Sequence, residues 1–310
     1  MRRLVHNIIL IGLLLHCQKG HSQDIHFSQF FASPLFTNPA LAGQFEGTYR
    51  FTGIIRRQWA SVSAQPYQTF GGGIDINKPL NLKPVGIGLR IGQDYAGLSN
   101  YSNTSIDVPI SFRIRFGAKK SWLLAFAGQI GFFQLNYDMG RVSYGDQYNG
   151  VRYDPSTPSQ DQYAGSNPSV LRLNLGSGVY LENRISERKR IGLGFSSFNL
   201  TQPNISLVKS SSSELARRSN IHAFSSFPIG SSPMDLMPAF QYQFQGIHRE
   251  LLFGSAIRYH LSTEANNVKS VQAGLWGRAK DAGYLSVGLQ QNSLYLGASY
   301  DFNLSGLKVA

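Results

Sequence analysis

Histidine is the residue type in this sequence that could bind a metal ion or transfer protons near neutral pH. His26 lies two residues after Asp24, with no set of further ligands at the spacing of a known metal motif. A protein metal site needs three or four converging ligands. The sequence therefore predicts neither a metal site nor a cofactor. Three other histidines lie far apart on different expected strands or loops: His222, His248 and His260.

The sequence lacks the residue patterns that three further functions require. The glycine run 71–73 has no Gly-Lys-Ser/Thr ending and precedes no helical pattern, so it is not a phosphate-binding loop. No Ser/His/Asp set at a family spacing is visible. The basic residues are scattered and not gathered on one surface, which argues against nucleic-acid binding. We therefore expect a protein that is not an enzyme, with an outer-membrane hydrolase as the weaker alternative.

Charged side chains within otherwise apolar runs are the other residues that could do chemistry. Such charges could pair across strands and brace a wall, or they could line a pore and select solutes. The brace is favoured because both signs occur in one strand. We expect five of these charges to face a lumen, because a charge in lipid costs about 2–4 kcal/mol at the midplane: Arg90, Asp107, Arg113, Arg115 and Arg258.

The elements that carry these charges alternate strictly between apolar and polar residues. Residues 106–116 keep period two over a length typical of a tilted membrane strand, with isoleucine, valine and phenylalanine on one face. Residues 85–92, 171–181 and 236–245 show the same alternation. A soluble sandwich also alternates, but its strands average about 5–6 residues and seldom end in aromatic girdles. These patterns favour a membrane barrel.

We expect an all-β fold, a transmembrane antiparallel β-barrel of about 14 strands, of which thirteen are visible. Bacterial single-chain barrels have an even number of strands, so a fourteenth is missing, miscounted or encoded beyond this sequence. The long connections 138–168 and 200–217 follow odd-numbered strands and are expected outside the cell. The thirteen strands are expected near 48–59, 67–77, 84–94, 101–116, 121–137, 169–182, 190–199, 218–227, 234–245, 249–261, 268–277, 282–290 and 293–302.

The composition agrees with this fold class. The chain has 310 residues, a formal net charge of +12, 32 glycines, 20 phenylalanines and one cysteine. Abundant glycine and aromatics with only 15% charged residues argue against disorder and against a helical bundle. A single cysteine excludes a disulfide framework. Mean hydropathy is −0.17, as in a chain whose strands alternate apolar and polar residues.

The first 22 residues are typical of a Sec signal peptide. Arg2 and Arg3 precede the apolar run 8–15, and small residues at 20–22 offer a cleavage site before Gln23. Cys17 raises the alternative of a lipoprotein, but His16 stands where a lipobox needs a small residue. The sequence predicts export to the cell outer membrane, with outer-membrane lipid around an integral barrel.

Residues 23–47 have no sustained strand period, although they are too apolar for a free tail. Pro34 and Pro39 remove backbone donors, and a spanning strand in lipid must pair every N–H. We expect a plug at the barrel mouth, either a docking element for a partner or a segment that fills volume. The expected plug and docking residues are His26, Phe27, Ser28, Gln29, Phe30, Asn38, Pro39, Ala40 and Gly43.

The remainder of the chain, residues 48–310, is expected to form the barrel, with its last strand missing. Arg57 and Trp59 end the first expected strand. We interpret them as rim residues, an arginine that extends its charge toward water and a tryptophan of the interfacial girdle.

Residues 24–43 resemble the opening signature of the PorP/SprF family of Bacteroidota outer-membrane proteins. The blocks 56–59, 66–70 and 300–305 resemble later family segments, although the final strand of the family is absent here. The resemblance implies an outer-membrane component of type IX secretion and gliding motility that delivers or anchors surface adhesins. Its implied partners are the type IX translocon and adhesin C-terminal domains. The alternative is a diffusion channel or apolar-solute porin.

Overall fold

A computed structural model describes residues 25, 27–59, 65–97, 99–207, 212–264 and 267–304. The expected signal peptide and His26 lie outside these residues. Among the helices within these ranges, none is long and apolar enough to cross a membrane.

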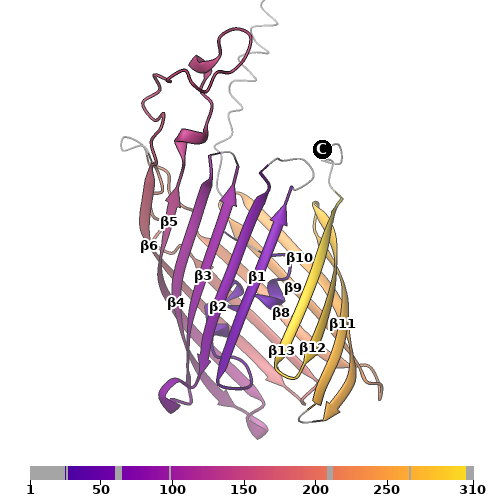
Figure 1. The fold of residues 1–310 in the computed structure, drawn as a ribbon. Helices are drawn as coiled ribbons and strands as arrows, with labels where there is room; N and C mark the ends of the chain where they lie inside the picture. The colour runs from indigo at the N-terminus through magenta and orange to yellow at the C-terminus, as the bar shows by residue number, and fades with distance from the viewer. Residues whose placement is uncertain are drawn as a thin grey trace, which may run out of the picture.

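One sheet contains thirteen antiparallel strands, each paired with its neighbours in the sequence. It curves into a barrel (Figure 1). The predicted fold class and all thirteen strands are confirmed, and the largest difference is that β10 ends at Glu264. The strands are β1 (Tyr49–Gln58), β2 (Tyr67–Asn77), β3 (Val85–Ala96), β4 (Tyr101–Phe116), β5 (Trp122–Asn136), β6 (Ser169–Arg184), β7 (Arg190–Phe198), β8 (Arg218–Pro228), β9 (Met234–Gln245), β10 (His248–Glu264), β11 (Asn267–Arg278), β12 (Ala282–Gln291) and β13 (Leu294–Asn303).

The alternation in the sequence corresponds to two faces with different surroundings. On β4, Ile106 and Ile110 are about half exposed, whereas Asp107 and Ser111 are fully buried. An apolar surface of this extent would be costly in water but is satisfied by hydrocarbon. The outward face is therefore apolar, as expected of a barrel wall in a membrane. Other strands present the same face through Phe51, Ile55, Ile74, Leu193, Phe253, Leu275, Val287 and Leu296.

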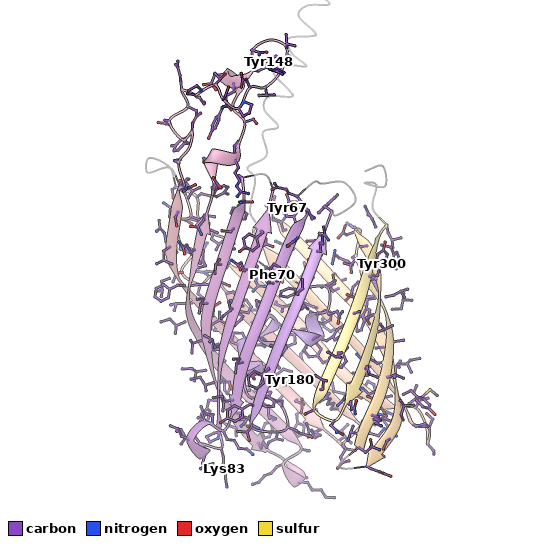
Figure 2. All side chains as sticks on the ribbon, viewed as in Figure 1. Tyr67, Phe70, Lys83, Tyr148, Tyr180 and Tyr300 are labelled. Carbon is purple, nitrogen blue, oxygen red and sulfur yellow. The ribbon has the colours of Figure 1, made fainter. Side chains whose placement is uncertain are left out.

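The meander places successive connections at alternate ends of the barrel. The long connections that follow β5 and β7 share one end, and Tyr148 of the first lies well beyond the strands (Figure 2). Lys83, in the short turn after β2, lies at the opposite end (Figure 2). Long connections at one end and short turns at the other are typical of outer-membrane barrels, with the long ones outside.

β1 and β13 are the two edges of the sheet. Because thirteen is odd and every pair is antiparallel, these two edges run in the same direction. The described residues form no ladder between them. The predicted fourteenth strand is not among the described residues.

Candidate functional site

The barrel interior is occupied by residues 27–43, which we call the inner segment. It forms three short helices, η1 (Phe30–Ala32), α2 (Pro34–Thr37) and η2 (Pro39–Leu41), visible between the strands in Figure 1. Each proline stands at a first helical position, where a missing N–H costs nothing. Asn38 caps η2, because its side-chain oxygen accepts from Ala40 N at 2.8 Å.

The middle of the inner segment is fastened to β6, β7 and β8. Asn38 Nδ2 donates to Val179 O at 2.9 Å and to Phe195 O at 3.2 Å. The main-chain oxygen of Thr37 accepts from Ser196 Oγ at 2.7 Å and from Asn220 Nδ2 at 2.9 Å. Asn38 is fully buried, so these bonds satisfy polar groups that water cannot reach.

The last residues of the inner segment are fastened to β2 and β4. Gly43 N donates to Asp75 Oδ2 at 2.7 Å, and Gly43 O accepts from Arg113 Nη1 at 2.5 Å. Asp75 also accepts from Arg50 Nε at 2.9 Å and Nη2 at 2.7 Å. Ser111 Oγ donates to Ala42 O at 2.7 Å. A short segment is thus held by charged groups on the wall.

The beginning of the inner segment is fastened to the last strands. Ser28 Oγ donates to Asp301 Oδ2 at 2.7 Å and accepts from Arg278 Nη2 at 2.8 Å. Tyr284 OH donates to Ser28 O at 2.6 Å. Arg278 also pairs with Glu250 at 3.0 Å. The inner segment therefore spans the lumen from β13 to β2.

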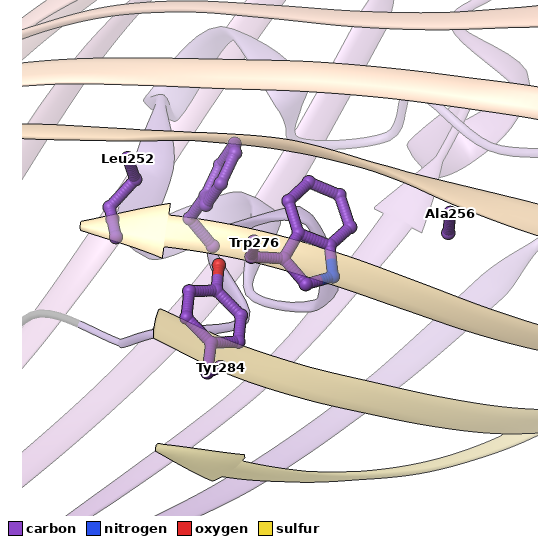
Figure 3. Packing of buried hydrophobic residues seen from close by; sticks show 5 residues of the cluster. Leu252, Ala256, Trp276 and Tyr284 are labelled. Carbon is purple, nitrogen blue, oxygen red and sulfur yellow. The ribbon is translucent and has the colours of Figure 1, made fainter. Parts of the chain in front are cut away.

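Aromatic packing adds to these polar contacts. Phe30 packs with Leu252, Ala256, Trp276 and Tyr284 in one buried cluster (Figure 3). Phe30 meets Trp276 edge to face, with ring centroids 6.2 Å apart. Trp276 Nε1 donates to Ser286 Oγ at 2.8 Å, so the indole N–H is satisfied.

The five expected lumen charges do not form one ladder. Arg90 and Asp107 form a buried ion pair between β3 and β4, and Gln129 Nε2 donates to Asp107 at 3.0 Å. Arg113 binds the inner segment and the turn after β2. Arg115 is exposed near the end of β4. Arg258 is half-buried on β10, with Nη2 3.5 Å from Gln272 Oε1.

Arg90 also touches the inner segment. Its guanidinium lies 4.9 Å from the ring centre of Phe36 and 5.3 Å from that of Phe198. A cation over an aromatic face within about 6 Å is attractive. Arg90, which was expected only as a lumen-facing charge of the wall, therefore also contacts the inner segment.

The remaining expected residues lie as follows. Phe27, Gln29, Pro39 and Ala40 are buried. Arg57 and Trp59 are exposed at the end of β1. No cluster of three or more metal-ligating side chains occurs among the described residues.

Sequence reasoning missed several residues that hold the inner segment: Asp75, Ser196, Asn220, Arg278, Tyr284 and Asp301. The sequence pattern around Asp75 could have identified this residue. It stands between Ile74 and Ile76, on the polar side of an alternating strand, as Asp107 does. A carboxylate on that side needs a partner, and the partners are Arg50 and Gly43.

Comparison with family models gives a match over residues 19–310 to the type IX secretion system membrane protein PorP/SprF. The chain belongs to the PorP/SprF family. This confirms the resemblance seen in residues 24–43 and makes the protein an outer-membrane component of type IX secretion. Comparison with curated proteins finds no match.

Among solved structures, the chain is similar to CdiB from Acinetobacter baumannii, with 10% identity and a TM-score of 0.41. The match covers 85% of this chain and 56% of the CdiB chain. This chain therefore spans little more than half the length of the protein to which it is similar.

Proposed function

We propose that this PorP/SprF protein is a non-enzymatic accessory of type IX secretion and gliding that helps to deliver or anchor adhesins at the cell surface. The observation that carries the proposal is the filled lumen. The inner segment is fastened to strands on three sides of the barrel through Ser28, Asn38 and Gly43. A diffusion channel needs an open aqueous path, whereas a docking protein needs a rigid frame.

A cavity at the long-loop end supports an outward docking role. Its volume is about 250 Å³, and it lies between the ends of β4, β5 and β9 and the connection that follows β7. Tyr101 and Tyr137 contribute two rings whose centres are 4.8 Å apart. Leu135 and Leu215 add an apolar floor. Such a lining suits an apolar side chain of a secreted domain, with polar contacts at its edge.

Deletion of residues 27–43 tests the proposal. We expect a heat-modifiable barrel in the outer membrane, increased conductance in planar bilayers, and loss of adhesin display. Loss of display without loss of the barrel separates docking from folding. Normal display after deletion would contradict the proposal, and conductance by the unmodified protein would favour a diffusion channel.

The cavity at the long-loop end, which we call the outer cavity, is tested separately by Tyr137→Ala, with Tyr148→Ala as the control. Tyr148 is an exposed aromatic that packs on Tyr153 in the same connection but does not line the cavity. We expect the first variant to reduce capture of adhesin C-terminal domains and the second to leave it unchanged. Equal capture by both variants would exclude this cavity as the docking point.

A further inference from the structure

Exposed basic side chains gather on one arc of the barrel end opposite to the long connections. The turns after β2, β4 and β6 follow one another along this arc, because β3 pairs with β4 and β5 with β6. Lys83 marks this end in Figure 2. We call six of these exposed side chains the basic rim: Lys78, Lys83, Arg115, Lys119, Lys120 and Lys189.

Ion pairs within the chain do not neutralise the basic rim. Nearby Arg184 pairs with Glu46, and Arg188 pairs with Asp235. In the described part of the chain, none of the six basic-rim residues takes part in an ion pair. Glu187 is the exposed carboxylate of the turn after β6. The arc therefore carries a strong positive excess that stays available to a partner.

The backbone of two of these turns is held in an uncommon conformation. Lys78 has φ 59°, Lys119 has φ 53° and Lys120 has φ 54°. Few residues other than glycine adopt this left-handed region. Arg113 donates to Lys83 O at 3.2 Å and to Gly43 O at 2.5 Å, so the first turn is also tied to the inner segment. The backbone conformation and these hydrogen bonds therefore fix the positions of the turns that carry the lysines.

The uneven distribution of charge indicates what the basic rim binds. Lipid headgroups surround a barrel on every side, so a role in lipid binding would place basic residues in all turns of this end. The turns 229–233, 265–266 and 292–293 contain no charged residue in the sequence. Arg115 lies two residues after Arg113 and therefore on the same, polar face of β4. A partner that approaches one side of the mouth fits this pattern better than lipid does.

We propose that the basic rim is a docking surface for an acidic face of a periplasmic protein. This goes beyond the proposed handling of adhesins and does not depend on it, because the basic rim lies at the other end of the barrel from the outer cavity. Opposite charges across such an interface increase the association rate and orient the partner.

Binding of poly-L-glutamate to the purified protein tests the charge requirement. The test variant carries Lys78→Gln, Lys83→Gln, Lys119→Gln and Lys120→Gln. The control carries Arg152→Gln, Arg217→Gln, Arg249→Gln and Lys280→Gln, which remove the same charge from the other end. We expect binding to weaken about tenfold in the test variant, as for several exposed charge pairs, and to stay unchanged in the control.

Salt gives a measurement that needs no variant. Binding by the unmodified protein should fall between about 50 and about 300 mM salt, because added salt screens the attraction between exposed charges. Absence of binding at low salt, or equal binding by the test and control variants, would overturn the proposal.

Photo-crosslinking in cells identifies the class of partner. A crosslinking residue at Leu82, which is exposed in the turn after β2, should give a protein adduct that the four-glutamine variant abolishes. The same residue at Ser231, in an uncharged turn of the same end, should give none. Adducts with lipid alone, or equal protein adducts at both positions, would exclude the proposed partner.

Discussion

A Cβ atom on Gly178 would lie 2.0 Å from Oδ1 of Asn38. The side-chain amide of Asn38 can therefore reach the backbone of β6 and β7 only because β6 has no side chain at this position. The inner segment and the wall are complementary at the level of a single methyl group.

Gly178→Ala should displace Asn38 and release the middle of the inner segment. The loss of two hydrogen bonds to a buried amide should cost about 1–3 kcal/mol. Urea titration of the folded barrel in lipid measures this cost. Gly128→Ala is the matched control, since a Cβ there meets no atom within 4 Å. Equal stability of the two variants would show that Asn38 is not held as described.

Asp75→Asn should loosen the C-terminal end of the inner segment. Asp75 is fully buried, and it accepts from both Arg50 and Gly43. Removing one partner of a buried pair leaves an uncompensated charge and costs about 3–5 kcal/mol, less here because Arg50 is partly exposed. A double-mutant cycle with Arg50→Gln isolates the pair. A coupling energy near zero would contradict the role of this ion pair.

Ile110→Arg should destabilise the barrel by about 2–4 kcal/mol in bilayers, because it places a charge in hydrocarbon near the midplane. Ile110→Val, which keeps the apolar face, should change stability little. Folding titrations in bilayers and in short-chain detergent compare the two. If Ile110→Arg is tolerated in bilayers, the exposed face of β4 does not contact lipid.

Asp146 should make the connection after β5 sensitive to acid. Its carboxylate accepts from Gln160 N at 2.7 Å and from Ser159 Oγ at 2.8 Å, and these hydrogen bonds lower the pKa of Asp146. The stabilisation is therefore complete above the ordinary pKa of about 4. It is lost as the pH falls through the lowered pKa of the folded state.

Pepsin cleavage of this connection measures the effect of pH, with Asp146→Asn compared at each pH. The unmodified protein should resist cleavage better than the variant above about pH 4, and the difference should vanish in stronger acid. A difference that persists at all pH values would mean that the carboxylate charge is not responsible.

The orientation of the barrel predicts which end labels in intact cells. Val151→Cys lies in the exposed connection after β5, and Leu82→Cys lies in the turn after β2. An impermeant maleimide should label the first in intact cells and the second only after lysis. The reverse result would place the basic rim outside the cell.

The sequence alone predicted the strands well, because period two is a local property. In residues 106–116 successive side chains lie on opposite faces of the strand. A membrane environment favours apolar side chains on one of these faces along the whole length. For the same reason, the inward direction of Arg90, Asp107 and Arg113 could be expected from neighbouring residues. The two prolines of the inner segment excluded a spanning strand by chemistry that is also local.

The partners of those inward residues were decided by tertiary structure. From the sequence, Ser111 is one of the polar positions that alternate with apolar ones in residues 106–116. In the fold, it is fully buried and donates to Ala42 O, so Ser111→Arg would displace the inner segment. Position 111 is 69 residues from position 42, and no periodicity connects them.

The same reason explains why Ser28 could not be assigned to Asp301, which is 273 residues away, or Asn38 to Gly178. Alternation gives the direction of a side chain relative to its own strand. Which segment fills the lumen, and where it rests, depends on the closing curvature of thirteen strands and on the shape of the space that they enclose. Those are properties of the assembled sheet, because the free energy of burying the inner segment comes from surfaces that do not exist until the strands have paired.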